Sequence, residues 1–200
     1  HHETVAAFRV NGAVVVRGNH DDMDSDPRKD MHMAAADAAV WTRTALSEAH
    51  KAFLRALPLS VREDDRLYVH ADASAPEKWR YVANAEAAAR SLAATDARLV
   101  FCGHMHTPMV YLQRSTGQTA PFTPLPGKVC ALTRHRRWHV VLGSVGQPRN
   151  RDPAASFALF DSTKSEITFH RAAYDVDAAA RAIRSAGLPD ALATRLFEGR

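Results

Sequence analysis

The stretch LVFCGHMH, residues 99–106, is the part of the sequence that decides the fold. Its first four residues are apolar and include a β-branched and an aromatic side chain, which predicts a short buried strand. A glycine and two histidines follow directly. Neutral imidazole is the most common protein metal ligand near pH 7, and glycine permits a tight turn. The stretch therefore predicts a strand that presents two candidate metal ligands at its end, although two solvent-facing loop histidines would give the same pattern.

Two earlier stretches have the same design, VVVRGNHD at residues 14–21 and LYVH at residues 67–70. Asn19 offers a neutral carbonyl oxygen to a metal, and the adjacent His20 can act as an acid or a base. The competing interpretation is a strand-to-loop turn, where Gly, Asn and Asp are expected residues. A lone histidine such as His70 is more often a hydrogen-bonding residue than a ligand. Taken together, three predicted strand ends carry residues that can bind metal or move protons.

Periodicity and turn residues predict the remaining elements. We expect helices at residues 32–43, 47–56, 84–94, 174–186 and 190–197, and the tail of another at residues 3–10. We expect strands at residues 13–16, 60–63, 67–70, 98–102, 109–113, 129–133, 138–142, 156–161 and 166–171. Residues 22–30, 71–81 and 118–128 are expected to be loops. Helix and strand alternate early and strands dominate later, which predicts an α/β layered sandwich with a mixed sheet.

Composition places the chain among ordinary globular proteins. Its 200 residues suit one domain, and 46% hydrophobic and 24% charged residues are usual values. The net charge of +4 comes from scattered arginines, which makes nucleic acid an unlikely partner, and an anionic small-molecule substrate would explain the positive bias equally well. Two cysteines imply no disulfide framework and a reducing, cytoplasmic location, and no apolar stretch approaches the ~20 residues that span a membrane.

The three clusters, in this order, resemble the motifs of the calcineurin-like metallophosphoesterase superfamily. The family motifs are Asp-x-His, Gly-Asp-x-x-Asp, Gly-Asn-His-(Asp/Glu), a lone His and Gly-His-x-His. The last three match residues 18–21, His70 and residues 103–106. The stretch GSVGQPR, residues 143–149, is similar to a loop of the small prokaryotic branch, which includes phosphodiesterases and diadenosine-tetraphosphatase-like phosphatases. The resemblance covers the chain from about residue 3 and implies a single αββα domain over residues 1–200.

The resemblance also implies a mechanism and a set of site residues. Two divalent metals would clamp a phosphate ester, and a metal-bound hydroxide would attack it. Because imidazole and amide groups are neutral ligands, Mn, Fe, Ni or Zn would suit the site better than Mg. The implied substrate is a small phosphate ester or a nucleotide, with monoester and diester both open. The implied metal ligands are Asn19, His70 and His104 for one ion and His106 for the other, the general acid is His20, and the candidate phosphate contacts are Arg17 and Arg149.

The chain departs from the family pattern at its N-terminal end. Only 17 residues precede Gly18, and their sole acid is Glu3, so Asp-x-His and Gly-Asp-x-x-Asp have no counterpart. We therefore expect a domain that lacks its first β-α-β unit, as a fragment of a longer polypeptide would. Substitute acids at Asp22, Asp24, Asp26 or Asp72 are one alternative, with solvated surface loops as the favoured interpretation of those residues.

Three functions are compatible with these residues. The first is a metal-dependent phosphoesterase. The second is a catalytically incomplete protein of the same fold that acts as a binding or interaction module. A non-catalytic protein would not need five such residues together, and this argues against the second function. The five residues are Asn19, His20, His70, His104 and His106. The third is a protein that binds one ion at Asn19, His70 and His104.

Overall fold

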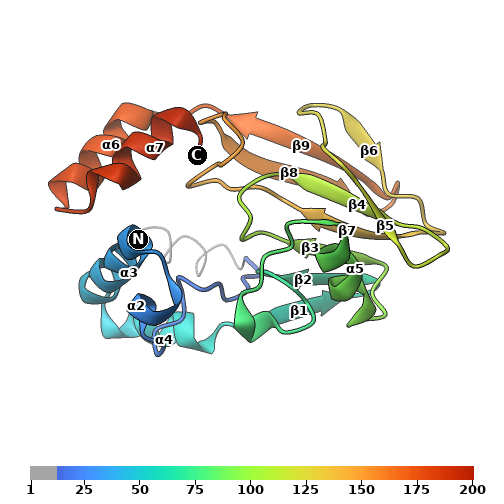
Figure 1. Cartoon of the computed structure of the whole chain (residues 1–200), viewed down its shortest axis with the longest axis horizontal. Helices are drawn as coiled ribbons and strands as arrows, with labels where there is room; N and C mark the ends of the chain where they lie inside the picture. Colours follow the sequence, from blue (N-terminus) through green and yellow to red (C-terminus); the bar gives the residue numbers. More distant parts are fainter. Residues whose placement is uncertain (1–12) are drawn as a thin grey trace.

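The computed structural model describes residues 13–200 and contains two β-sheets packed face to face (Figure 1). The helices are α2 (Pro27–Asp30), α3 (Met33–Ala45), α4 (Glu48–Ala56), the 3-10 helix η1 (Pro76–Lys78), α5 (Ala85–Ala93), α6 (Val176–Ser185) and α7 (Asp190–Glu198). The strands are β1 (Ser60–Glu63), β2 (Arg66–Val69), β3 (Leu99–Cys102), β4 (Met109–Gln113), β5 (Thr119–Phe122), β6 (Val129–Ala131), β7 (Arg137–Val141), β8 (Ala155–Asp161) and β9 (Glu166–Ala172). The helix expected at residues 3–10 lies outside the described residues.

The larger sheet is mixed, as the sequence predicts. Its six strands run in the order β1-β2-β3-β7-β4-β5, and β2, β3 and β7 are parallel neighbours. The other pairs in this sheet are antiparallel. Parallel neighbours bring their carboxyl ends to one edge, so the segments that follow β2, β3 and β7 meet there. These segments carry His70, residues 103–106 and residues 143–149.

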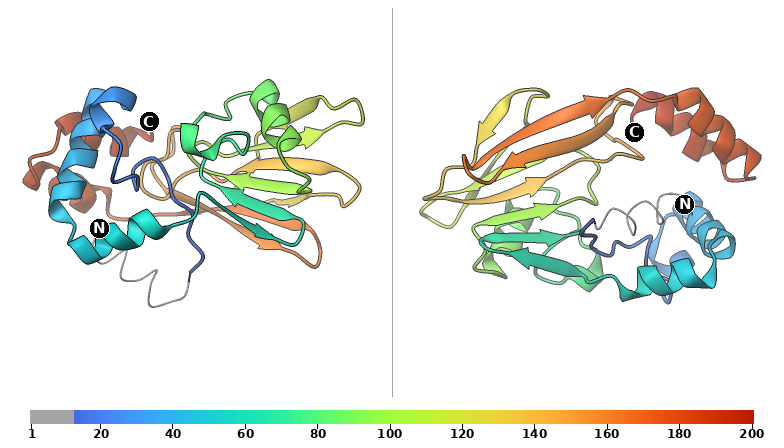
Figure 2. Two further views of the ribbon diagram at one scale, coloured as in Figure 1. Left: turned by 90° about the horizontal axis from the view of Figure 1, so that it is seen from below. Right: turned by 180° about the vertical axis from the view of Figure 1, so that it is seen from behind.

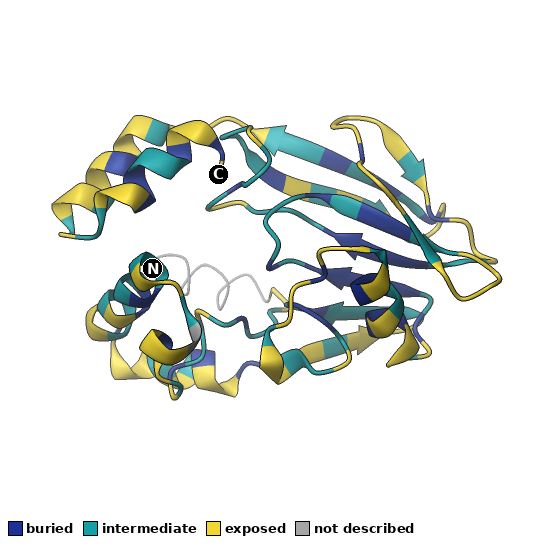
Figure 3. Ribbon diagram, in the orientation of Figure 1, coloured by how far each residue is buried: buried dark blue, intermediate teal, exposed yellow. Residues whose placement is uncertain are grey.

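Two apolar layers hold the sheets and helix α5 together. Between the sheets lie fully buried side chains such as Leu99, Val140 and Ile167. On the opposite face of the six-stranded sheet, α5 packs through Ala88 and Leu92 against Val100 and its neighbours. Figure 3 shows the buried positions concentrated in these strands. The predicted α/β sandwich is therefore confirmed.

The closing helices occupy a different place from the outer layer of an αββα sandwich. The outer face of the three-stranded sheet β6-β9-β8 leaves Phe157 and Leu159 exposed. Helices α6 and α7 extend beyond the end of this sheet and do not cross its face (Figure 2). They thereby reach the end of the molecule where α2 and α3 lie (Figure 1).

Two predicted helix caps and the predicted burial of Cys102 are confirmed. The Ser47 side chain caps α4 by accepting from the backbone N–H of His50, and Asn84 caps α5 by accepting from Ala87. Cys102 is a buried free thiol, and no disulfide forms within residues 13–200. No helix in this range combines the length and the apolar character needed to cross a bilayer.

Three local predictions are wrong. Residues 13–16 form no strand: Val14 is 76% exposed, and no strand of residues 13–200 pairs with this segment. A β-branched run forms a strand only where a neighbouring backbone accepts its hydrogen bonds. Residues 119–122, expected as loop, form β5, because an edge strand tolerates Pro121. The expected loop at residues 22–30 contains α2, which the Asp26 side chain caps.

Candidate metal centre and its pocket

Three donor atoms converge at the carboxyl ends of β2 and β3. The Nε2 atom of His70 lies 3.0 Å from Oδ1 of Asn19 and 3.1 Å from Nδ1 of His104. The backbone N–H of Gly103 donates to the His70 carbonyl oxygen at 3.0 Å and holds the two segments together. In the sequence, His70 is 51 positions from Asn19 and 34 positions from His104. The fold therefore brings three distant residues to one point.

The spacing of these atoms suits a single metal ion. Metal–nitrogen bonds are about 2.1 Å long, so two ligands at right angles around one ion are roughly 3 Å apart. Residues 13–200 contain no group of three or more His, Cys, Asp or Glu that could hold a metal, and His70 and His104 are the only two such residues in the hydrogen-bonded trio described here. The third donor here is the Asn19 amide. The described residues therefore offer one ion two imidazole nitrogens and one amide oxygen.

The outer nitrogens of two histidines have partners that fix the rings. His104 donates a hydrogen bond to the Trp79 backbone, and His106 Nδ1 donates to the Gln147 carbonyl oxygen at 2.7 Å. A neutral imidazole that donates through one nitrogen keeps a lone pair on the other, and metal-binding histidines are oriented in this way. Each ring therefore presents one unprotonated nitrogen.

Burial keeps these imidazoles neutral. It lowers the pKa of His70 to about 3, with help from the charges of His104 and His106. It likewise lowers the pKa of His104 to about 4 and that of His106 to about 4, where Arg149 adds to the effect. Since metals bind unprotonated imidazole, all three rings are in the binding form at neutral pH.

The backbone around the site is strained. His104, His106 and Trp79 adopt left-handed conformations, with φ of 61°, 60° and 51°. Such conformations are unfavourable for residues other than glycine and concentrate at functional sites. Gly18 is required for another reason: a Cβ there would lie 2.8 Å from Nδ1 of His70. The glycine of GNHD thus makes room for a ligand ring on a different segment.

His20 lies beside the donor atoms on a loop that Asp21 closes. The Gly18 N–H donates to Asp21 Oδ2 at 2.9 Å, and the Asp21 N–H donates to the Gly18 carbonyl at 3.0 Å. The surrounding protein lowers the pKa of His20 by desolvation; Asp21 opposes this shift and Arg149 adds to it. His20 is therefore a neutral, positioned group next to the candidate metal centre.

These residues open into a cavity of about 1140 Å³. Asn19, His20 and His104 line it together with residues of α2, α3 and α7 and the aromatic side chains of Trp79 and Tyr81. Figure 1 shows α7 and the α2–α3 pair at the same end of the molecule. This volume is large enough for a ligand well beyond an inorganic phosphate.

Two aromatic residues of the cavity lining went unnoticed in the sequence. Tyr81 stacks on the His104 ring, with centroids 4.1 Å apart and planes at 16°, and Trp79 meets the His70 ring edge-on at 5.9 Å. Their only signal was a Trp-Arg-Tyr run in an expected loop. Such runs are common on surfaces, so only the fold identifies them.

The two predicted phosphate contacts lie in different places. Arg149 lines the cavity with His20, and the backbone N–H of Arg149 donates to the His106 carbonyl oxygen at 3.0 Å. Arg17 is absent from the cavity lining, and its Nη1 lies 3.5 Å from the Arg55 carbonyl oxygen. The geometry favours Arg149, and the substrate role of Arg17 stays a prediction.

The four candidate substitute acids have other partners. Asp24 pairs with Arg55 at 3.1 Å, Asp26 caps α2, and Asp22 accepts from the Asp24 N–H. Asp72 corrects the expectation of a solvated loop: it is fully buried and pairs with Arg90 at 2.7 Å. This ion pair holds the segment after His70 against α5.

Comparisons with known proteins identify the family of this chain. The model of the calcineurin-like phosphoesterase superfamily domain matches residues 2–165. An uncharacterised protein of Methanocaldococcus jannaschii is 29% identical over 204 residues, covering 99% of this chain and 80% of that protein.

Two solved structures are similar over 99% of the chain. A metallophosphoesterase from Sphaerobacter thermophilus is 34% identical, with a TM-score of 0.87 over 82% of its own chain. A hypothetical protein from Pyrococcus horikoshii has a TM-score of 0.72 over 78% of its chain and, at 17% identity, shows the fold alone. The match over most of the sequence, together with the converging Asn19, His70 and His104, places this chain in the calcineurin-like phosphoesterase superfamily.

Proposed function

We propose that this protein hydrolyses small phosphate esters, monoesters or diesters, at the carboxyl ends of β2 and β3. The observation that carries the proposal is the convergence of Asn19 Oδ1, His70 Nε2 and His104 Nδ1 beside His20, inside a cavity that Arg149 also lines. Phosphoryl transfer needs positioning and neutralisation of charge, and this combination of residues supplies both.

Asn19, His70 and His104 would hold one divalent cation, and the free nitrogen of His106 would reach a second. A pair of divalent cations, as this family generally uses, polarises phosphoryl oxygens and lowers the pKa of a coordinated water. Neutral nitrogen donors favour Mn²⁺, Fe²⁺, Ni²⁺ or Zn²⁺ over Mg²⁺.

His20 would donate a proton to the departing oxygen of the ester. In the free protein desolvation and Arg149 keep its pKa low. A phosphate anion bound beside the ring would raise this pKa again, because negative charge favours the imidazolium form. Substrate binding would thus protonate His20 at the point where the proton is used. Arg149, with its planar guanidinium, suits the phosphate oxygens.

The test is hydrolysis of aryl phosphate mono- and diesters by the protein loaded with Mn²⁺. We expect turnover to fall about 10²- to 10⁴-fold in His20→Ala, the usual contribution of a general acid, while the metal content stays unchanged. His135→Ala is the matched control, because His135 is an exposed loop residue outside the cavity. Loss of metal from His20→Ala would make His20 a ligand instead of the acid.

The binding-module alternative has one observation in its favour. Within residues 13–200 no carboxylate contacts the three converging donor atoms. Metal binding without hydrolysis of any aryl phosphate ester would support this alternative and count against the phosphoesterase.

A further inference from the structure

Helix α7 brings an arginine to the cavity that no sequence motif indicated. Arg195 lines the same cavity as His20 and Arg149. The end of α7 is docked beside Arg149, because the Arg151 N–H donates to the Gly199 carbonyl at 2.8 Å. Gly199 has a φ of +60°, and a Cβ there would lie 2.5 Å from the Asp152 nitrogen. The position of Arg195 is therefore set by a tight backbone contact.

Arg149 and Arg195 are cations without an Asp or Glu partner. Neither forms an ion pair with any residue of the range 13–200. Arg149 donates to Gln147 Oε1 at 3.1 Å, whereas its buried Nε has no partner. Arg195 Nε donates to the main-chain oxygen of Arg200, the last residue of the sequence, at 2.7 Å, which leaves its Nη groups for a ligand.

The acidic residues around the cavity do not neutralise this pair. Glu198 is paired with Arg200, and Asp190 is paired with Arg184 at 2.6 Å. Asp22 and Glu77 also line the cavity, and neither forms an ion pair with Arg149 or Arg195. Burial and the charges of Arg149 and Arg200 lower the pKa of Arg195. Two partly buried like charges oppose each other, and a bound anion would relieve this repulsion.

The two arginines belong to different elements around the candidate metal centre: the Arg149 backbone N–H donates to the His106 carbonyl at 3.0 Å, whereas Arg195 is on α7. The charge of Arg149 lowers the pKa of His20, His104 and His106, whereas the charge of Arg195 lowers the pKa of His106 alone among these histidines. Arg149 is thus tied directly to the segment that carries His104 and His106, whereas Arg195 reaches the cavity from the closing helix. A phosphate between the two arginines would be separate from the one held at Asn19, His70 and His104.

We propose that Arg149 and Arg195 form a second phosphate subsite, which selects esters that carry another phosphoryl group besides the one hydrolysed. This inference rests on the proposed function. Guanidinium groups match phosphate oxygens in geometry as well as charge, and the cavity of about 1140 Å³ has room for such a substrate.

The test compares methylphosphonate, with one phosphonate group, and methylenediphosphonate, with two. Binding of both probes to the metal-free protein is measured by calorimetry, so that chelation of the metal does not contribute. We expect the second probe to bind at least about tenfold more tightly, the usual effect of an additional charge-assisted hydrogen-bonded contact.

Arg195→Ala should remove most of this preference, and Arg195→Lys should restore part of it, since lysine supplies charge without the fork. Arg181→Ala is the control, because it removes the same charge from an exposed position on α6 outside the cavity. Equal weakening of both probes in Arg195→Ala, or no weakening of either, would overturn the proposal.

A second arm separates this proposal from the proposed function. Hydrolysis of p-nitrophenyl phosphate by the Mn²⁺-loaded protein tests the phosphoesterase alone, because this ester has a single phosphate. Turnover of that ester with no preference between the two phosphonates would overturn only the subsite. A preference for the diphosphonate without turnover would overturn only the phosphoesterase.

Discussion

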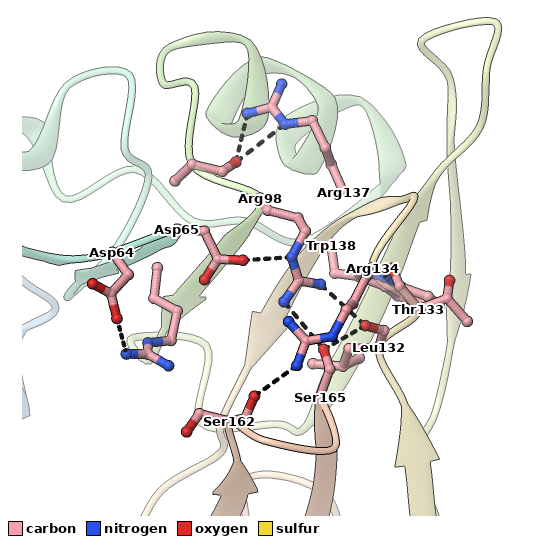
Figure 4. Close-up of polar contacts among 12 residues, drawn as sticks. Asp64, Asp65, Arg98, Leu132, Thr133, Arg134, Arg137, Trp138, Ser162 and Ser165 are labelled. Atoms are coloured by element: carbon pink, nitrogen blue, oxygen red, sulfur yellow. Dashed lines mark hydrogen bonds and ion pairs between the residues drawn. The ribbon is translucent and has the colours of Figure 1, made fainter.

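The two ends of the six-stranded sheet use arginine in opposite ways. At the amino ends of β3 and β7, Arg98 donates to Asp65 at 2.6 Å, to the Leu132 carbonyl and to Ser165 Oγ (Figure 4). Arg137 at the same end donates to the carbonyls of Leu92, Thr95 and Ala97. At the carboxyl ends, Arg149 and Arg195 form no ion pair with an Asp or Glu side chain described within residues 13–200.

This difference separates charges that hold the fold from charges that face a ligand. Arg98 joins the two sheets, because Asp65 belongs to the turn before β2 whereas Ser165 precedes β9. Its guanidinium is satisfied within the protein and has no capacity left for a ligand. The carboxyl ends instead combine neutral imidazoles, strained backbone and unpaired cations, each of which costs stability and is characteristic of functional sites.

Acid should affect the protein most, because four desolvated imidazoles must become charged, of which His104 and His139 are buried and His70 and His106 half-buried. Burial lowers the pKa of His139 to about 4 and shifts His70, His104 and His106 in the same direction. The unfolded chain, with histidines near 6.5, binds more protons, so stability is complete above about pH 6.5 and decreases towards pH 4. For the metal-free protein we expect a loss of several kcal/mol, of which about 3 kcal/mol comes from fully buried His139.

Denaturant unfolding at pH 7 and pH 4.5 measures this loss. His139→Gln should show a smaller difference between the two pH values than the wild type, whatever its stability at pH 7. An unchanged difference would mean that His139 does not contribute to the acid sensitivity.

Arg98→Ala tests the structural end of the sheet. We expect a loss of about 3 kcal/mol in the free energy of unfolding, because Asp65, Leu132 and Ser165 all lose a partner. Arg62→Ala is the control: its pair with Asp96 is exposed, and its removal should cost at most about 1 kcal/mol. Similar losses in the two variants would contradict the role of Arg98 as a link between the sheets.

His70→Ala tests the other end and should have the opposite signature. Metal affinity, measured by calorimetry with Mn²⁺, should fall at least about 100-fold, because a ligand is lost and not merely its support. Stability of the metal-free protein at pH 7 should change little, since functional sites are seldom optimised for stability. A large loss of stability with unchanged metal affinity would make His70 a structural residue like Arg98.

Gly18→Ala should have the smallest effect. The new Cβ would lie 2.8 Å from Nδ1 of His70 and must displace that ring, so we expect metal affinity to fall about tenfold. Gly146→Ala is the matched control, because no atom lies within 4 Å of a Cβ at that position. Equal metal affinities in the two variants would show that the His70 ring can move freely.

Much of the fold could be predicted from local patterns, and the failures have physical causes. Strands such as residues 99–102 and 109–113 and the caps Ser47 and Asn84 depend on nearby residues. Residues 13–16 failed as a strand because pairing requires a distant partner, and β5 was missed because prolines in an edge strand look like loop residues. The burial of Asp72 was not predicted, because it depends on an ion pair with Arg90 of α5, which lies 18 positions away in the sequence.

The sequence by itself determined the family and the order of the strand-end motifs, since alternation, glycines and histidines act over a few residues. Only the tertiary structure decided which of these groups meet. The register of the parallel strands β2 and β3 brings His70 Nε2 within 3.1 Å of His104 Nδ1. Gly18 leaves room for the His70 ring, because it has no Cβ to contact that ring. The docking of α7 beside Arg149 then adds Arg195 to the cavity. Such contacts depend on how distant elements pack, and no local pattern encodes that.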